Sequence, residues 1–408
     1  MARPHATVKI KCTPDDFRVE ELSSVRFGAA TGPFALYRLA KTGLGTMEAV
    51  ERVKRRWDIA QKRVSYGGLK DRHARTEQFL TIHAGPRADL ELVDVSLRYL
   101  GQTPHPFTPH AIDGNRFTLV IRALSREAVA RAAPVLDAIA RDGVPNYFDN
   151  QRFGSVGTGD EFVAAAWIKG DFEHALRLAI ATPHPFDRAA QRGLKQTLRD
   201  HWGDWAACKE KLPRSHERSI VTYLCDHPLD FRRAFARLRQ HLRSLYLAAF
   251  QSHLWNEMLG LWIRTTCAPE HVTELPLRFG PVPFWTAIPP ALQDRVRTVR
   301  LPLPSARVRG GDPEALRIME AALGARGLAT RDLRIKHPKD NFFSKGERAV
   351  AVVPMRLAHA ADADELYPDR IKLTLAFELP RGAYATMLVK RLSPALERSV
   401  ELDEEDEG

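Results

Sequence analysis

The chain has 408 residues, 44% of them hydrophobic and 27% charged, a composition typical of a globular protein with about two domains. It contains neither a run of roughly 18 apolar residues nor an N-terminal signal segment, so we expect a cytoplasmic protein and exclude a membrane or secreted one. The net charge of +11 suggests a polyanionic partner such as nucleic acid, although a general basic bias or simple solubility would explain it equally well.

The cysteines and histidines show no spacing typical of a metal site. Cys12, Cys208, Cys225 and Cys267 are scattered without a Cys-x-x-Cys pair, which argues against both a zinc site and a disulfide framework. The chain also lacks the glycine and lysine spacing of a phosphate-binding nucleotide loop. The sequence therefore predicts a reduced protein with no metal and no nucleotide cofactor.

The first third of the chain mixes strand patterns with helix patterns. Apolar and polar residues alternate over several short stretches, which is typical of half-buried strands. Thr46 is a suitable N-cap for a helix that ends at Trp57. The predicted elements are strands at 8–19, 34–40, 79–83 and 116–122 and helices at 46–57 and 126–141.

Residues 67–78 form a glycine-containing, highly charged loop that leads into the predicted strand at 79–83. Asp71 stands between Lys70 and Arg72, whose positive charges favour an ionised carboxylate. An ionised carboxylate can act as a nucleophile or as a general base. Taken alone, the loop is equally compatible with a surface turn that contains an ion pair, and such turns are the commoner case.

A second unusual cluster covers residues 146–154. It contains three amides, three aromatic residues and one arginine within nine positions. Amides can read the hydrogen-bonding edge of a base, and aromatic rings can stack on its face. The alternative is an asparagine-rich turn whose aromatic residues belong to the core.

The middle of the chain, from about residue 171 to 260, has a helical pattern rich in arginine. Apolar residues recur every three or four positions from Phe231 to Ala249, which predicts one amphipathic helix. Arg237, Arg239 and Arg243 flank its apolar face. They would either contact RNA phosphates or belong to a solvated helix face.

The pattern returns to strand near the C-terminus. Residues 371–379 show the clearest alternation of the chain, and Tyr384 follows after the turn at 380–382, where it could equally be an ordinary core residue. Strands on both sides of a helical middle indicate an insertion within an α+β domain. The tail 401–408 has six acidic residues among eight, and we expect it to be solvated and disordered.

Together these segments resemble the TruD family of tRNA pseudouridine synthases. The family loop Gly-x-Lys-Asp-x-x-Ala-x-Thr-x-Gln is matched by Gly68, Lys70, Asp71, Ala74, Thr76 and Gln78. Residues 146–154 look like the family segment Asn-Tyr-Phe-Gly-x-Gln-Arg-Phe-Gly, with Asp149 in place of the first glycine. Residues 381–386 resemble Arg-Gly-Ser-aromatic-Ala-Thr, with Ala383 in place of serine. A Lys-x5-Phe-x2-Glu pattern fits Lys11, Phe17 and Glu20.

The resemblance implies the fold class and the domains. We expect a discontinuous α+β fold with a pseudouridine-synthase-like mixed, largely antiparallel sheet, flanking helices and an inserted second α+β domain. Residues 1–171 and 359–400 would form the catalytic domain, and residues 172–358 would form the insertion. The sequence says little about oligomeric state, and a monomer is slightly favoured.

The resemblance also implies the reaction. The chain would isomerise uridine to pseudouridine in tRNA, usually at uridine 13, without a cofactor. Asp71 would attack C1′ of a flipped-out uridine or promote glycal formation, and Lys11, or less favourably Lys70, would keep it ionised.

The substrate-binding residues implied by the resemblance would surround one pocket. Phe17 and Tyr384 would form its walls and Asn146 would orient the base. The full set is Phe17, Glu20, Asn146, Phe148, Gln151, Arg152 and Tyr384. Three alternatives remain: a non-catalytic RNA-binding protein with the same fold, a synthase acting on other RNAs, and an RNA hydrolase with Asp71 in a metal site.

Overall fold

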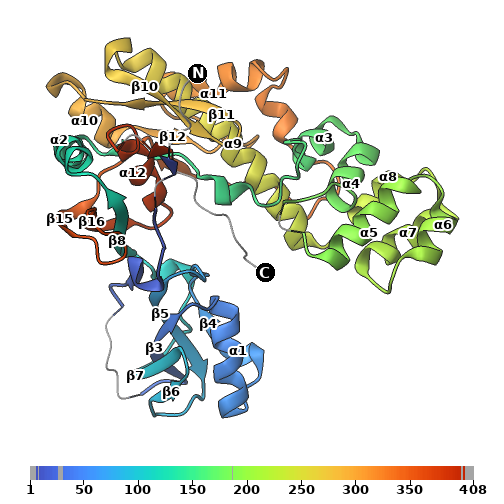
Figure 1. Ribbon diagram of the computed structural model, residues 1–408. Coiled ribbons are helices and arrows are strands. Elements are labelled where there is room, and N and C mark those ends of the chain that lie inside the picture. Colours follow the sequence, from blue (N-terminus) through green and yellow to red (C-terminus); the bar gives the residue numbers. More distant parts are fainter. Residues whose placement is uncertain (1–5, 8, 26–30, 186, 397, 400–408) are drawn as a thin grey trace. The chain divides into compact units, whose positions relative to one another are not determined.

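The computed structural model describes residues 6–7, 9–25, 31–185, 187–396 and 398–399, so the tail predicted to be disordered lies outside the described residues. The chain forms two compact units. The first unit contains Met1–Val144 and Val352–Gly408, and the second contains Pro145–Ala351 (Figure 1). These limits differ from the predicted domain boundaries after residues 171 and 358, and the extent of a catalytic domain stays a prediction.

The first unit is built on one mixed sheet, which confirms the predicted α+β class. Within the described residues it has nine strands in the order β15-β16-β8-β2-β5-β3-β7-β6, with β4 paired to β5. Neighbouring strands are antiparallel except β2 and β5, which run parallel. The strands are β2 (Phe17–Leu22), β3 (Phe34–Thr42), β4 (Val64–Tyr66), β5 (Arg75–His83), β6 (Leu90–Leu92), β7 (Val95–Thr103), β8 (Gly114–Leu124), β15 (Met355–Ala363) and β16 (Ile371–Pro380).

The alternation predicted at residues 371–379 is confirmed as β16. Its inward residues Leu373, Leu375 and Phe377 are buried, and Leu375 pairs with Leu119 of β8. β8 also pairs with β2, so the C-terminal part of the chain joins the sheet next to the N-terminal strands. The pairing of β16 with β8 is therefore what makes the first unit discontinuous in sequence.

Helices cover this sheet at two places. Helix α1 (Thr46–Trp57) packs Ala49, Val50 and Val53 into a core that includes Tyr37 and Leu80 of the strands. Helix α2 (Arg126–Asp142) contacts β15, β16 and α12 (Ala385–Leu392). Two short strands, β1 (Ala6–Thr7) and β17 (Arg398–Ser399), pair in parallel as a separate two-stranded sheet.

Thr46 does not have the predicted capping role. The N-cap of α1 is Gly45, and Thr46 is the first helical residue. The Thr46 hydroxyl instead bonds to residues 70 and 78, as described below. Because Gly45 is the N-cap, the Thr46 side chain makes tertiary hydrogen bonds and does not cap the helix.

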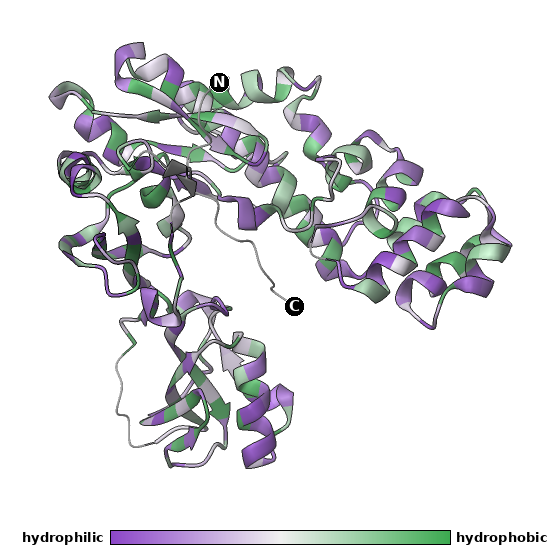
Figure 2. Ribbon diagram, viewed as in Figure 1, coloured by the Kyte–Doolittle hydropathy of each residue, from purple (hydrophilic) through white to green (hydrophobic). Residues whose placement is uncertain are grey.

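The second unit is mainly helical. Helix α9 runs through its core, with Trp255, Leu259 and Trp262 fully buried, and it contacts α3, α11, β11 and β12. In Figure 2 the helices α4 to α8 carry both hydrophilic and hydrophobic residues, as expected for amphipathic helices. The elements are α3 (Val163–Lys169), α4 (Phe172–Ile180), α5 (Ala189–Asp200), α6 (Trp205–Lys211), α7 (His216–Asp226), α8 (Phe231–Ala236), α9 (Gln240–Thr266), β10 (Val272–Leu277), β11 (Gly280–Trp285), α10 (Pro290–Thr298), β12 (Arg300–Pro302), α11 (Pro313–Gly324) and β13 (Glu347–Ala349). The chain passes from one unit to the other within β9 (Val144–Pro145) and β14 (Ala351–Val352).

The single helix predicted from Phe231 to Ala249 is wrong. The chain forms α8 and α9 with a break at residues 237–239. Arg243 is buried and pairs with Asp340 at 2.9 Å, and Arg237 lies 4.0 Å from the ring centre of Tyr223. Two of the arginines considered for RNA contact therefore have partners within the fold.

No helix among the described residues has the length and hydropathy needed to cross a bilayer.

Candidate active site

Asp71 lies on the loop between β4 and β5, and buried polar side chains hold this loop. Gln78 of β5 donates from Nε2 to the carbonyl oxygen of Gly68 at 3.0 Å. The Thr46 hydroxyl donates to Gln78 Oε1 at 2.7 Å and accepts from the Lys70 amide at 2.8 Å. Because Thr46 and Gln78 are almost fully buried, these bonds fix the loop backbone before Asp71.

The Asp71 carboxylate is held between two donors and stays partly open to solvent. Its Oδ2 forms an ion pair with the ammonium of Lys11, and its Oδ1 accepts from the His73 amide at 3.0 Å. One third of its side chain (33%) is exposed. The Lys11 ammonium also lies 4.7 Å from the ring centre of Phe17. Three residues predicted for the site, Lys11, Phe17 and Asp71, therefore lie together.

A buried ion cluster secures the segment that carries Lys11 and Phe17. The Arg122 guanidinium of β8 donates to Asp16 at 2.7 Å and to Asp364 at 2.9 Å. Asp16 in turn accepts from the Thr13 amide at 3.0 Å. The hydrogen bonds that the Arg122 guanidinium donates, first of all the one to Asp16, raise the pKa of Arg122 above its usual value. The cluster therefore anchors residues 13–17 to the middle of the sheet.

Lys70 points to partners other than Asp71. Its ammonium pairs with Glu21 at 3.0 Å and donates to Asn115 Oδ1 at 2.6 Å. The other Glu21 oxygen accepts from the Phe79 amide at 3.1 Å, and the Glu21 side chain is fully buried. Lys70 thus ties the loop to β2 and β8. Glu21 had no signal in the sequence that separated it from Glu20.

Lys41 is a second residue that the sequence did not single out. Lys41 lies near the end of β3, and only 1% of its surface is exposed. Its ammonium donates to the carbonyl oxygen of Asp71 at 2.6 Å and to that of Leu44. Burial lowers the pKa of Lys41 to about 8. Lysines are rarely buried, so no sequence pattern could have placed this one beneath the loop.

Glu20 lies on the opposite face of β2 from Phe17, because successive strand residues point to opposite faces. Glu20 accepts from Arg116 at 3.1 Å, and Arg116 also binds Glu378 at 2.8 Å. The Phe17 ring lies 6.2 Å from that of Phe117. Glu20 therefore belongs to an ion-pair row across the sheet, whereas Phe17 lies beside the Lys11–Asp71 pair.

Tyr384 is half-buried at the N-cap of α12, in the same unit as Asp71. The turn before it is tied to the start of β8, because the Arg381 amide donates to the Asp113 carbonyl at 3.1 Å. Asn115, the partner of Lys70, lies two residues further along the chain.

The other predicted substrate-binding residues lie in the second unit, and Asn146 is bonded there on both sides of its amide. Its Nδ2 donates to the carbonyl oxygen of Ala349 at 3.0 Å, and its Oδ1 accepts from Arg348 at 2.6 Å. Arg348 also donates to the Asn146 carbonyl at 2.8 Å. With 7% of its surface exposed, Asn146 serves the internal structure of this unit.

The rest of the segment ranges from buried to exposed residues. The main chain of Phe148 exchanges two hydrogen bonds of 2.8 Å with the Asn256 side chain, and the Phe148 ring lies 4.2 Å from the Arg348 guanidinium. Gln151 and Arg152 are exposed, and Arg152 donates to Ser252 at 3.1 Å.

The described residues contain no group of three or more histidines, cysteines and acidic residues that could hold a metal ion.

Comparisons with known proteins agree with this fold. A crystal structure from Methanosarcina mazei, assigned as a tRNA pseudouridine synthase D, covers 97% of this chain and 94% of its own with a TM-score of 0.72 at 24% identity. That likeness identifies the fold as one found in the pseudouridine synthase class. A Geobacter sulfurreducens protein named tRNA pseudouridine synthase D is 29% identical over 395 residues, covering 94% of this chain and 93% of the relative.

The family follows from the match along the sequence. The family model of tRNA pseudouridine synthase D (TruD) matches residues 2–274 and 287–392. A Methanococcus maripaludis protein named "Probable tRNA pseudouridine synthase D 1" is 28% identical over 398 residues, covering 94% of this chain and 99% of the relative. The chain therefore belongs to the TruD family of isomerases, and the resemblance found in the sequence is confirmed.

Proposed function

We propose that this chain isomerises uridine to pseudouridine in tRNA, at uridine 13, with Asp71 as the catalytic carboxylate. The observation that carries the proposal is the Asp71 carboxylate itself. It lies partly exposed on a loop fixed from beneath, beside a lysine ammonium, in a chain of the TruD family. We place the reaction in the cytoplasm and slightly favour a monomer over an oligomer.

The chemistry needs a group that acts at C1′ of the ribose. The N1–C1′ bond breaks, the base turns, and C5 bonds to C1′ while its hydrogen leaves as a proton and N1 takes one up. Asp71 either attacks C1′ as N1 leaves and is displaced when C5 attacks, or removes the C2′ proton to give a glycal and returns it when the C5–C1′ bond forms. Both are carboxylate chemistry. The uridine must leave its stack to reach the carboxylate, and Phe17 and Tyr384 form the walls that receive it.

The residues around Asp71 hold it in place. Lys11 neutralises the carboxylate and sets its direction, and Lys41 is a positioning residue because it bonds to the Asp71 carbonyl oxygen. Lys70 keeps the loop attached to β2 and β8. These contacts support a preorganised site, in which little rearrangement precedes the reaction.

The second unit binds the RNA. The exposed side chains of Gln151 and Arg152 contact the nucleic acid, and Asn146 and Phe148 shape the surface from which they project. We assign residues 1–171 and 359–400 to the catalytic domain and residues 172–358 to the insertion. Glu20 lies on the face of β2 opposite Phe17, so we assign it a structural role through its ion pair to Arg116 and not a contact with the substrate.

The test is release of tritium from tRNA carrying 5-tritiated uridine. A synthase releases tritium to water, a binding protein leaves it in the RNA, and a hydrolase shortens the strand. A transcript with cytidine at position 13 tests the target. Full release from that transcript would overturn the assignment of uridine 13 while leaving the isomerase in place.

A further inference from the structure

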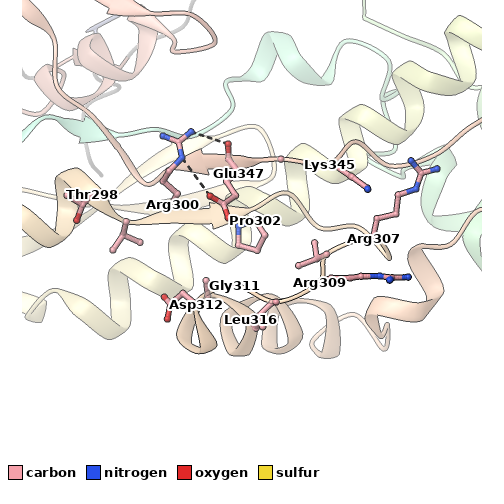
Figure 3. A pocket seen from close by; sticks show the side chains of 15 residues that line it. Thr298, Arg300, Pro302, Arg307, Arg309, Gly311, Asp312, Leu316, Lys345 and Glu347 are labelled. Carbon is pink, nitrogen blue, oxygen red and sulfur yellow. Dashed lines mark hydrogen bonds and ion pairs between the residues drawn. The ribbon is translucent and has the colours of Figure 1, made fainter.

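A pocket of about 680 Å³ lies in the second unit, and none of the residues predicted for the site lines it. Strands β12 and β13 line one side, and the loop 307–312 with the start of α11 lines the other. Figure 3 shows Arg307, Arg309 and Lys345 gathered at one end of this pocket. The pocket is therefore a basic hollow built from three separate chain segments.

The charges of this pocket do not cancel. Glu347 is used by Arg300, whose guanidinium lies 4.0 Å from its carboxylate and 3.3 Å from its carbonyl oxygen. Asp312 caps α11 by accepting from the Glu314 amide at 3.2 Å. Over the part of the chain that the structure describes, no carboxylate lies within 4.0 Å of the charged nitrogens of the other three cations, Arg307, Arg309 and Lys345. Three like charges at one pocket repel each other, and an anion would relieve that repulsion.

The backbone of the pocket also suits an anion. Gly310 and Gly311 have φ angles of 67° and 114°, which residues with a side chain adopt only with strain. A Cβ atom at either position would meet nothing within 4 Å, so the space beside them is open. A phosphate oxygen can therefore approach the backbone of this loop closely.

An exposed aromatic ring next to the pocket indicates which kind of phosphate fits. Phe342 is 55% exposed, and the Arg307 guanidinium lies 4.2 Å from its ring centre. An aromatic ring beside arginine and lysine is the combination that binds single-stranded nucleic acid, by stacking a base and neutralising the next phosphate. A free phosphate would make no use of this ring, so the ring indicates a ligand that carries both a base and a phosphate. In a chain of the tRNA pseudouridine synthase D family, that ligand is RNA.

We propose that Arg307, Arg309 and Lys345 bind a backbone phosphate of an unpaired RNA strand, whose adjacent base stacks on Phe342. This inference rests on the proposed function in that the ligand is the RNA substrate. It adds a contact on the second unit that is independent of the Asp71 chemistry.

The experiment compares two double variants of the full chain. Arg309→Gln with Lys345→Gln removes two cations from the pocket. Arg233→Gln with Arg331→Gln removes the same charge from two exposed arginines that each lie beside an aspartate. The affinity for tRNA is measured by fluorescence anisotropy from 50 to 200 mM salt, and thermal midpoints verify folding.

We expect the pocket variant to bind roughly tenfold more weakly than the control, with a salt slope lower by about 0.7–0.9 for the lost phosphate. Phe342→Ala should weaken binding of single-stranded RNA while leaving the salt slope unchanged. Equal affinity and equal slope in the two double variants would overturn the proposal.

Tritium release separates this inference from the proposed function. If the wild type releases tritium and the pocket variant binds tRNA with unchanged affinity, the phosphate site is refuted and the isomerase stands. If the variant binds more weakly but the wild type releases no tritium, the isomerase is refuted and the phosphate site stands.

Discussion

The chain has two polar segments of similar appearance, one in each unit, and they use their polar groups in opposite ways. In the loop before β5, Thr46, Gln78 and Lys41 fix the backbone and leave the Asp71 carboxylate partly exposed. In the segment 146–154 the Asn146 side chain is buried and has both ends of its amide bonded inside the unit.

The difference shows what makes a polar segment a candidate site. Composition alone selected both segments, because both are rich in polar and charged residues. A reactive group must, however, be held by its surroundings and still be accessible to a substrate. Asp71 meets both conditions, whereas Asn146 meets only the first. Substitution of Asp71 should therefore change the reaction rate, and substitution of Asn146 should change stability.

The largest expected effect is that of Asp71→Asn. A neutral amide cannot replace a carboxylate as nucleophile or base, so the single-turnover rate should fall at least 10²- to 10⁴-fold. The free energy of unfolding should change by no more than about 1 kcal/mol, because partly exposed ion pairs contribute little. Tritium release at saturating enzyme and urea unfolding measure the two quantities.

The control for this variant is Glu51→Gln, which removes an exposed carboxylate paired with Lys54 on α1. It should leave the rate unchanged. Near-normal turnover by Asp71→Asn would contradict the proposed mechanism. A large loss of stability in that variant would instead favour a structural ion pair.

The second prediction concerns how the stability of the second unit depends on pH through His253, which packs against the segment 146–154. His253 stacks on Phe162 with ring centres 4.7 Å apart, lies 6.4 Å from Phe153 and accepts a bond from Arg326. Burial lowers its pKa to about 4, against the opposing effect of Glu257. Between about pH 4 and 6.5 the unfolded chain binds a proton that the folded chain excludes. The free energy of unfolding should therefore fall by about 3 kcal/mol as pH drops through this window.

Carboxylates elsewhere in the chain also titrate in this range. The measured quantity is therefore the difference in the free energy of unfolding between the wild type and His253→Gln. Urea unfolding at several pH values gives that difference. It should shrink as the pH falls from 6.5 to 4. A difference independent of pH would mean that the folded unit accepts the proton on His253.

The third prediction is that Asn146→Ala lowers stability more than it lowers the rate. The substitution leaves the Ala349 carbonyl and the Arg348 guanidinium without this partner, which costs about 1–3 kcal/mol in the free energy of unfolding. Urea unfolding measures the loss, and single-turnover rates are compared at a temperature where the variant is folded. A lost rate with unchanged stability would show that Asn146 contacts the substrate directly.

The smallest expected effect is that of Lys41→Met. It removes the charged hydrogen bond to the Asp71 carbonyl oxygen, so the carboxylate is less well placed. We expect kcat to fall roughly tenfold with KM nearly unchanged, since misplacement acts on the reaction and not on RNA binding. Lys54→Met, which removes a lysine paired with Glu51, serves as the control. A change confined to KM would place Lys41 in substrate binding.

Local patterns determined much of this protein. The alternation of apolar and polar residues predicted β16, and the spacing from Gly68 to Gln78 predicted both the family and the loop that carries Asp71. These features depend on neighbours in sequence, because a strand repeats every two residues and a loop motif is contiguous.

The tertiary structure alone decided which partners these residues meet. Lys11 reaches Asp71 across 60 residues, Lys41 reaches it across 30, and Arg348 reaches Asn146 across 202. It also separated Glu21, which binds Lys70, from its neighbour Glu20 on the other face of the strand. Periodicity encodes which face a residue takes but not what lies opposite, since that depends on how distant segments pack together.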